Sequence, residues 1–321
     1  MPFDPFLAAI LLAVVFAWWA PTVGADGGTL PLSGWVSAGI ALVFFLHGAQ
    51  LSREALHGGA RNWRLHVFVQ LSTFLFFPVI GAAVYFGLER WLPVEVRLAF
   101  FYLCALPSTI SSSVAMTALA RGNVSAAVFN AALSGILGMA ITPALMAFVT
   151  AHAVEGRPLG ESMVEIFERL LLPFAIGQLL RPLIGGFLSR YRAVVNVLDR
   201  AVIVLIVYTA FCNSIAQGVW AGGNGATVVI CIVLALLLVA AAFTFTTVVA
   251  RRLGFSRPDE VVAVFCGSKK SLASGAPMAK ILMGSAPALG VIMLPLIVYH
   301  QTQLLVAALL ARRYCAAALQ D

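Results

Sequence analysis

Residues 260–283 read EVVAVFCGSKKSLASGAPMAKILM, an apolar run with a polar interruption near its middle. A helix that crosses the hydrocarbon core needs about 20 mostly apolar residues, and this run is long enough. Its centre, from Gly267 to Ser271, holds the adjacent lysines Lys269 and Lys270. A charge at that depth costs at least about 2.5–3.5 kcal/mol on insertion scales, so such a residue is a functional candidate by default. The run therefore predicts an interrupted membrane helix around a buried cationic site.

A second apolar run, residues 96–119, is interrupted at a corresponding place. Its polar stretch is Leu106-Pro107-Ser108-Thr109-Ile110-Ser111-Ser112-Ser113, and in the first run the break continues into Ser274-Gly275-Ala276-Pro277. Pro93-Val94-Glu95-Val96 and Pro258-Asp259-Glu260-Val261 stand at the start of the two runs. An unwound stretch exposes backbone groups that lipid cannot satisfy. Matching breaks in two halves of a chain are a sequence pointer to a transporter's binding site.

The whole chain has the composition of a protein embedded in lipid. Of its 321 residues, 61% are hydrophobic and 10% are charged, whereas soluble proteins carry roughly 25% charged residues. We expect an all-α membrane protein of ten transmembrane helices, arranged as two inverted five-helix repeats. The longest polar connection, His152 to Arg169, lies between the halves. The predicted spans are 6–23, 32–50, 65–88, 96–119, 124–150, 170–188, 195–217, 226–250, 260–283 and 287–311.

The basic residues predict the orientation, because cytoplasmic loops are enriched in Lys and Arg. With a cytoplasmic N-terminus, thirteen fall inside, namely Arg53, Arg61, Arg64, Arg121, Arg181, Arg190, Arg192, Arg200, Arg251, Arg252, Arg257, Arg312 and Arg313. Five fall outside, namely Arg90, Arg97, Arg157, Arg169 and Lys280. This bias predicts a multi-pass protein of the cell inner membrane with both termini in the cytoplasm. The absence of a basic region before the first apolar run argues that this run is retained as a helix rather than cleaved as a signal peptide.

Several classes of function are disfavoured. The basic residues sit in short loops and are not interleaved with aromatics, which argues against nucleic-acid binding. The five cysteines form no CxxC pair, and no metalloprotease, phosphate-loop or paired-carboxylate pattern occurs. We therefore expect no enzyme and no cofactor, although a sodium ion is compatible with the hydroxyl-rich break. One enzymatic alternative is an intramembrane hydrolase with Ser271 or Ser112 as nucleophile and Lys270 as base. It would require a lysine within about 3.2 Å of a serine hydroxyl.

The candidate site comprises the two breaks and polar residues of other spans. A buried lysine could bind an anionic substrate, stand in for a bound cation, or lose its proton and carry protons; a structural lysine paired with backbone carbonyls is the alternative. Hydroxyls suit a sodium ion or an oxyanion, although serine can also bond back to its own helix. The predicted binding residues are Ser108, Thr109, Ser111, Ser112, Ser113, Asn130, Ser134, Gly267, Ser268, Lys269, Lys270, Ser271, Ser274, Gln70, Thr73 and His300. Asn213, Gln217, Gln301 and Gln303 are further intramembrane polar residues, each more typical of helix–helix contacts than of a ligand site.

Three motifs resemble the bile acid:sodium symporter family, solute carrier family 10. They are Pro107-Ser108-Thr109-Ile110-Ser111-Ser112-Ser113, Ala120-Arg121-Gly122-Asn123 and residues 265–280. The likeness is strongest to its SBF-like branch of bacterial sodium-dependent transporters and covers essentially the whole chain. It implies a core domain of spans 3–5 and 8–10 (residues 64–150 and 223–321). It also implies a panel domain of spans 1, 2, 6 and 7 (residues 1–63 and 151–222). Spans four and nine would cross, and substrate would bind behind the crossing.

The resemblance also implies where sodium would bind, and there the sequence departs from the family pattern. Bile acid carriers hold sodium with a Ser-Asn pair on span four, hydroxyls on span five, and a Glu and a Gln on span nine. Ser112 and Ser113 occupy the first place, and Asn130 lies near the second; these three are the candidate sodium ligands. Ala127 and Ala131 stand at the span-five hydroxyl positions. From Cys266 to Lys270 there is no acid, so a lysine ammonium could occupy a cation's place.

We therefore expect a secondary active transporter of a small organic anion, working by alternating access and coupled to sodium or protons. The principal alternative is a non-transporting regulatory membrane protein, for which we expect a sealed crevice with both lysines bonded to protein carbonyls. The sequence does not distinguish a monomer from a dimer.

Overall fold

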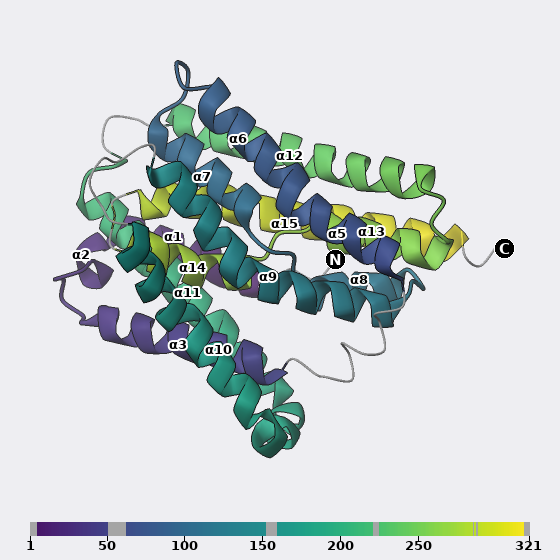
Figure 1. Ribbon diagram of the computed structural model, residues 1–321. Helices are drawn as coiled ribbons and strands as arrows, with labels where there is room; N and C mark the ends of the chain where they lie inside the picture. Colours follow the sequence, from purple (N-terminus) through teal and green to yellow (C-terminus); the bar gives the residue numbers. More distant parts are fainter. Residues whose placement is uncertain are drawn as a thin grey trace. The chain divides into compact units, whose positions relative to one another are not determined.

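The computed structural model describes residues 5–50, 62–151, 159–220, 225–284, 286 and 288–317. These residues are almost entirely helical and contain no strand (Figure 1). The elements, in chain order, are α1 (Pro5–Trp19), α2 (Pro21–Gly24), α3 (Leu32–Gln50), α5 (Trp63–Leu71), the π-helical turn η1 (Ser72–Phe76), α6 (Phe77–Gly87), α7 (Val94–Ala105), α8 (Ser111–Leu119), α9 (Val124–Ala151), α10 (Leu159–Arg190), α11 (Arg192–Ala216), α12 (Gly225–Arg252), α13 (Arg257–Gly267), α14 (Leu272–Met283) and α15 (Leu289–Ala317).

Seven helical stretches in the described part of the chain are long and apolar enough to cross a membrane, and α1 is a shorter apolar helix. The other two predicted spans are α7–α8 and α13–α14, whose halves are each too short to cross alone. The ten-span count, the inverted repeat and the core and panel domains stay predictions. Part of the connection predicted from His152 to Arg169 is helical, because α10 begins at Leu159. Arg53, Arg61 and Arg157 of the charge count lie outside the described residues.

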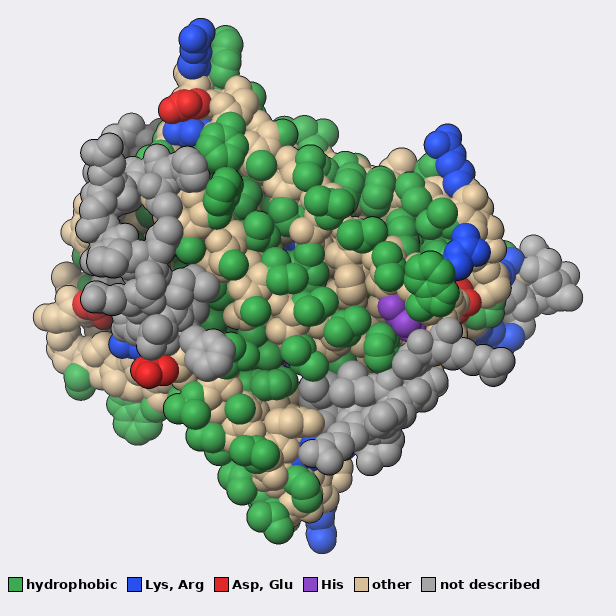
Figure 2. Space-filling model, in the orientation of Figure 1, with side chains coloured by type: hydrophobic (Ala, Val, Ile, Leu, Met, Phe, Trp, Pro, Cys, Tyr) green, Lys and Arg blue, Asp and Glu red, His purple; other side chains and the backbone are tan. Residues whose placement is uncertain are grey.

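Large apolar side chains cover much of the surface. Leu179 and Leu183 on α10 and Leu237 on α12 are among those exposed. On the face drawn in Figure 2, hydrophobic side chains are spread widely, while the described Lys and Arg side chains lie mainly toward its margins. Widespread exposure of large apolar side chains fits contact with lipid rather than with water.

The chain divides into two compact units, of which the first comprises Met1–Leu51, Ala147–Val228 and Ala273–Met293. In it, α3 and α10 lie side by side (Figure 1), and glycines allow their backbones to approach closely. A Cβ added at Gly177 would lie 2.0 Å from the carbonyl oxygen of Phe45, and one at Gly48 would lie 2.1 Å from that of Phe174. Small residues at the contact are typical of helix packing in membranes.

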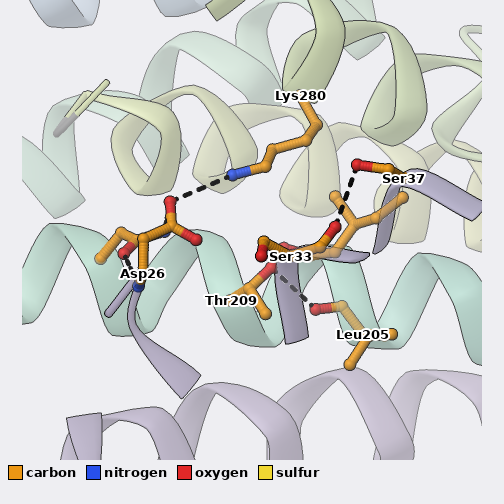
Figure 3. Close-up of polar contacts among 8 residues, drawn as sticks. Asp26, Ser33, Ser37, Leu205, Thr209 and Lys280 are labelled. Atoms are coloured by element: carbon orange, nitrogen blue, oxygen red, sulfur yellow. Dashed lines mark hydrogen bonds and ion pairs between the residues drawn. The ribbon is translucent and has the colours of Figure 1, made fainter. Parts of the chain in front are cut away.

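A polar cluster joins three segments of this first unit (Figure 3). The carboxylate of Asp26 lies 3.6 Å from the ammonium of Lys280 at the end of α14. The backbone N–H of Asp26 donates to the side-chain oxygen of Asn213 on α11 at 2.7 Å, and the Asn213 amide donates to the Asp26 carboxylate at 3.2 Å. Nearby, Ser37 and Thr209 donate to carbonyls one turn back in their own helices. Lys280 and Asn213, both noted in the sequence, thus hold the segment after α2.

The second unit comprises Ser52–Met146, Val229–Leu272 and Leu294–Asp321. Its apolar core brings α5, α9, α12 and α13 together, with small side chains where α9 and α13 meet. Ala127 stands at a position where bile acid carriers have a hydroxyl, and it is buried in this core. The Cys266 thiol donates a hydrogen bond to the Ala127 carbonyl at 3.8 Å. In this chain that position therefore packs helices together.

One carboxylate ties three helix starts together in the second unit. Asp259, in the first turn of α13, accepts hydrogen bonds from the amides of Asn62 at 2.7 Å and Asn123 at 3.0 Å. Asn62 caps α5 and Asn123 accepts from the N–H of Ala126 at the start of α9. Just before Asn123, Arg121 has the left-handed φ of 56° as α8 ends. The Ala120–Asn123 motif therefore forms a helix-to-helix turn whose cap is fixed by Asp259.

We predict that Gly177→Ala lowers the thermal unfolding midpoint in detergent, because its methyl group would force α10 away from the Phe45 carbonyl. Forced overpacking of this kind costs about 1–3 kcal/mol. Gly186→Ala in the same helix is the matched control, since an added Cβ there meets nothing within 4 Å. Gly186→Ala should leave the midpoint unchanged or raise it. Equal effects of the two substitutions would contradict the packing described for Gly177.

We also predict that Asp259→Ala destabilises the protein by about 1–3 kcal/mol, because two half-buried cap amides lose their acceptor. Thermal unfolding of the purified variant measures this. Glu95→Ala is the control, because Glu95 is the exposed acid in the first turn of α7. The interpretation fails if Asp259→Ala unfolds no earlier than Glu95→Ala.

Candidate functional site

The first break lies between Ala105 at the end of α7 and Ser111 at the start of α8. Pro107 explains its position, because proline lacks an N–H and holds the preceding residue in an extended conformation. Leu106 is accordingly extended, with φ −69° and ψ 152°. The observed break, residues 106–110, is shorter than the predicted one, because Ser111, Ser112 and Ser113 form the first turn of α8.

The second break lies between Gly267 at the end of α13 and Leu272 at the start of α14. The prediction that it continues through Ser274-Gly275-Ala276-Pro277 is wrong, because these residues lie inside α14. Ser274 belongs to the first unit, whereas the rest of the candidate site belongs to the second. Residues 106–110 and 268–271 are hereafter called the paired breaks.

The paired breaks and the helix ends beside them satisfy each other's backbone. The Ser108 hydroxyl donates to the carbonyl of Cys266 at 2.6 Å, and the Ser113 hydroxyl donates to that of Phe265 at 2.9 Å. In the opposite direction, the N–H of Ser271 donates to the carbonyl of Pro107 at 3.0 Å. Buried backbone groups in membrane proteins need such partners. The serines predicted to bind a ligand therefore also hold the two interrupted helices together.

Three residues outside the predicted site complete this network. Ser72 donates to the Gly267 carbonyl at 2.8 Å, and Tyr299 donates to the Ser268 carbonyl at 2.6 Å. Gln303 accepts from the Lys270 N–H at 2.8 Å and donates to the Lys270 carbonyl at 2.7 Å, as a backbone partner would. The sequence marked Gln303 only as one of several intramembrane amides. A tyrosine or a serine in an apolar run gives little signal by itself.

Lys270 is fully buried and its ammonium is surrounded by backbone oxygen. Nζ donates to the carbonyls of Thr73 at 2.9 Å, Cys104 at 2.8 Å and Leu106 at 2.6 Å. The ring of Phe77 covers the same nitrogen, 4.1 Å from Nζ to the ring centroid. Three donated hydrogen bonds use all three hydrogens of an ammonium, whereas a neutral amine has only two to donate. This arrangement is therefore that of a charged lysine.

The local sequence explains why these three carbonyls are available. In η1 the N–H of Phe77 donates to Ser72, five residues back, and the next residue, Pro78, has no N–H. The Thr73 carbonyl consequently loses both of its usual intrahelical donors. The Cys104 carbonyl lies in the last turn of α7, and the N–H of Ser108, four residues on, donates to the Ser134 hydroxyl at 2.9 Å instead.

Lys269 is equally buried but has a different environment. Its Nζ donates to one carbonyl, that of Ser112, at 2.9 Å, and lies 5.4 Å from the Phe265 ring centroid. Within the described residues neither lysine contacts an Asp or Glu. Ser112 is in the first turn of α8, where N–H groups have no intrahelical acceptor and no side chain caps the helix. Ser111 beside it is exposed and Ser112 is half-buried. The ammonium thus lies close to a positive helix end that has an exposed edge.

The structure brings most of the predicted residues into this network and places others apart from it. Thr109 shares hydrogen bonds with Ser112 at 2.7 Å and Ser113 at 2.9 Å. His300 contacts Gln303 at 3.0 Å and so joins the network through that amide.

Asn130 and Gln70 form a separate cluster in the second unit. The Asn130 amide contacts His66 at 3.0 Å and donates to the Ala126 carbonyl, and Gln70 donates to the Asn130 backbone at 3.2 Å. Ser112, Ser113 and Asn130, the candidate sodium ligands, are thus divided between the first turn of α8 and this cluster. The assignment of sodium to them stays a prediction.

The alternative of a Ser-Lys hydrolase finds no support in this geometry. A lysine that acts as a base needs a free lone pair on Nζ. All three hydrogens of Lys270 are directed at backbone carbonyls rather than at a serine hydroxyl. The nitrogen therefore has no lone pair to accept a proton.

Comparison with known proteins agrees with a membrane transporter. The chain is 44% identical to a Pseudomonas aeruginosa protein named "Uncharacterized protein PA2026", over 97% of this chain and 92% of that protein. It is 42% identical to the Escherichia coli K12 protein named "Putative symporter YfeH", over 97% of this chain and 92% of that one. Mouse "Sodium/bile acid cotransporter 7" is 30% identical, over 95% and 90% of the two chains.

The family name and the names of these relatives point to transporters and not to enzymes. Together with the apolar helices, they identify a multi-pass membrane protein. Residues 4–316 match the SBF-like CPA transporter family, and the chain belongs to that family.

Proposed function

We propose that the protein is a secondary active transporter of a small organic anion, that it works by alternating access, and that sodium ions or protons drive it. The relatives named as a symporter and a sodium/bile acid cotransporter support the transport class. In this proposal ten spans in two inverted halves form a core and a panel, in a cell inner membrane with both termini cytoplasmic. The thirteen-to-five distribution of basic residues in the predicted loops supports that orientation.

The observation that carries the anion assignment is the environment of Lys269. Its ammonium is buried, donates to one carbonyl and contacts no carboxylate among the described residues. An ammonium has three hydrogens to donate, so two remain for another acceptor. The uncapped first turn of α8 adds N–H groups and the positive end of a helix dipole. The hydroxyls of Thr109 and Ser112 are hydrogen-bonded to each other beside the Ser112 carbonyl that Lys269 contacts. Together these groups suit a carboxylate or another oxyanion.

For a regulatory protein we expected a sealed crevice and two lysines bonded to protein carbonyls. The second feature is present, since both lysines donate to carbonyls. A non-transporting role is therefore the second candidate function. The two candidates differ in what Lys269 does, because only a transporter needs its remaining hydrogens for a solute that moves.

We predict that an organic anion raises the unfolding temperature of the purified protein and crosses liposome membranes that contain it. The assay would offer mono- and dicarboxylates of increasing size under a sodium gradient, a proton gradient or neither. Lys269→Ala should weaken binding about 10- to 150-fold, since a hydrogen bond to a charged group contributes about 1.5–3 kcal/mol. Lys280→Ala is the matched lysine control, because Lys280 is paired with Asp26 in the other unit.

The proposal fails if no anion stabilises the protein or crosses the membrane under either gradient and Lys269→Ala changes nothing. That result would favour the regulatory role. Transport that follows only one of the two gradients identifies the coupling ion.

A further inference from the structure

We propose that the Lys270 ammonium is a tethered cation: it fills a backbone-carbonyl site that would otherwise bind a free monovalent cation such as sodium. The wild-type protein therefore binds no metal ion at this position, and removal of the side chain creates a sodium site. The inference concerns the same paired breaks as the proposed transport function and rests on it only for its consequence for coupling.

The shell around Nζ has the character of a cation-binding site. The three carbonyl oxygens of Thr73, Cys104 and Leu106 lie 2.6–2.9 Å from Nζ, and the face of Phe77 lies over it. Backbone carbonyls replace the hydration shell of monovalent cations in ion channels, and an aromatic face attracts any cation. The three oxygens belong to η1, α7 and the first break, so they stay in the chain as acceptors when the Lys270 side chain is removed.

These oxygens require a positively charged or hydrogen-donating partner. The π-turn and Pro78 deprive the Thr73 carbonyl of its intrahelical donors, and Ser108 donates to Ser134 rather than to Cys104. Leu106 precedes Pro107 within the break, outside either helix. At this depth water and lipid are poor substitutes, since an unsatisfied carbonyl is costly in hydrocarbon. Three carbonyl acceptors thus converge at one point, and the Lys270 ammonium is the cation that they bind.

Comparison with the neighbouring Lys269 shows that burial alone does not give a lysine this carbonyl shell. Lys269 and Lys270 are adjacent and equally buried, yet Lys269 donates to one carbonyl and Lys270 to three. A cation attached to the backbone cannot leave during a transport cycle. If the protein transports an anion, the Lys270 position therefore carries no ion across the membrane, and sodium coupling would need a different site.

The test compares Lys270→Ala with Lys270→Met in thermal unfolding of the purified full chain. Alanine removes the side chain and leaves the three carbonyls around a vacated space, whereas methionine fills much of that space without a charge. Each variant is measured in sodium chloride, in methylammonium chloride and in choline chloride at one ionic strength. Choline is the control cation, because it is too large for a space vacated by a lysine side chain.

We expect both variants to unfold earlier than the wild type in choline. Sodium or methylammonium should raise the midpoint of Lys270→Ala by on the order of 5 °C in a saturable way, since a ligand that binds only the folded state stabilises it. A cation response that Lys270→Met and the wild type share would report a site elsewhere, and the response of Lys270→Ala should exceed it. Lys269→Ala keeps the carbonyl shell around the Lys270 ammonium intact and should likewise lack this additional response.

The proposal is overturned if Lys270→Ala is as stable as the wild type in choline, or if no small cation stabilises it more than it stabilises Lys270→Met. A Lys270→Ala chain that cannot be recovered folded in sodium, while Lys270→Met can, contradicts it equally. The readout is stability rather than transport. A failure to find any transported anion therefore counts against the proposed function and leaves this test decisive for the tethered cation.

Discussion

The structure depends on one constraint: backbone groups that leave a helix at membrane depth must find partners inside the protein. Both paired breaks meet it through contacts that join them and the helix ends beside them. Hydroxyls of Ser108 and Ser113 satisfy carbonyls of α13, and the Ser271 N–H satisfies Pro107. Ser72, Tyr299 and Gln303 complete the backbone of the second break. The polar residues in these apolar runs are therefore first of all the means by which two interrupted helices remain stable together.

The two adjacent lysines of the second break have different environments. Neighbouring residues of a regular helix point about 100° apart, whereas the unwound backbone between Gly267 and Leu272 lets each side chain reach its own surroundings. Lys270 is enclosed by three carbonyls and an aromatic ring, and Lys269 lies against the uncapped start of α8. The first arrangement is saturated, whereas the second leaves hydrogens that, in the proposed function, bind the anion. The proposed roles, a fixed cation at Lys270 and a ligand-binding one at Lys269, rest on this difference in contacts.

Much of this could be predicted from the sequence, because its strongest signals are local. Hydropathy placed the helices, and Pro107 and the Gly267–Ser271 stretch located both breaks, since each feature acts on its own segment. The extension to Pro277 was wrong because α14 accommodates that proline within a regular helix. The partners of Lys270 could not be predicted, since they are backbone oxygens far away in the sequence. The π-turn beside Pro78 and the contact of Tyr299 with Ser268 are likewise consequences of packing.

The central claim is that Lys270 holds the two interrupted helices together through their backbone. Hydrogen–deuterium exchange of wild type and Lys270→Met, compared segment by segment at a temperature where both are folded, tests it most directly. The account predicts faster exchange in Lys270→Met at residues 104–113 and 266–272 and in η1, with the Asp259-capped starts of α5 and α9 unchanged. Protection that is unaltered in the paired breaks, or lost uniformly over the second unit, would contradict it.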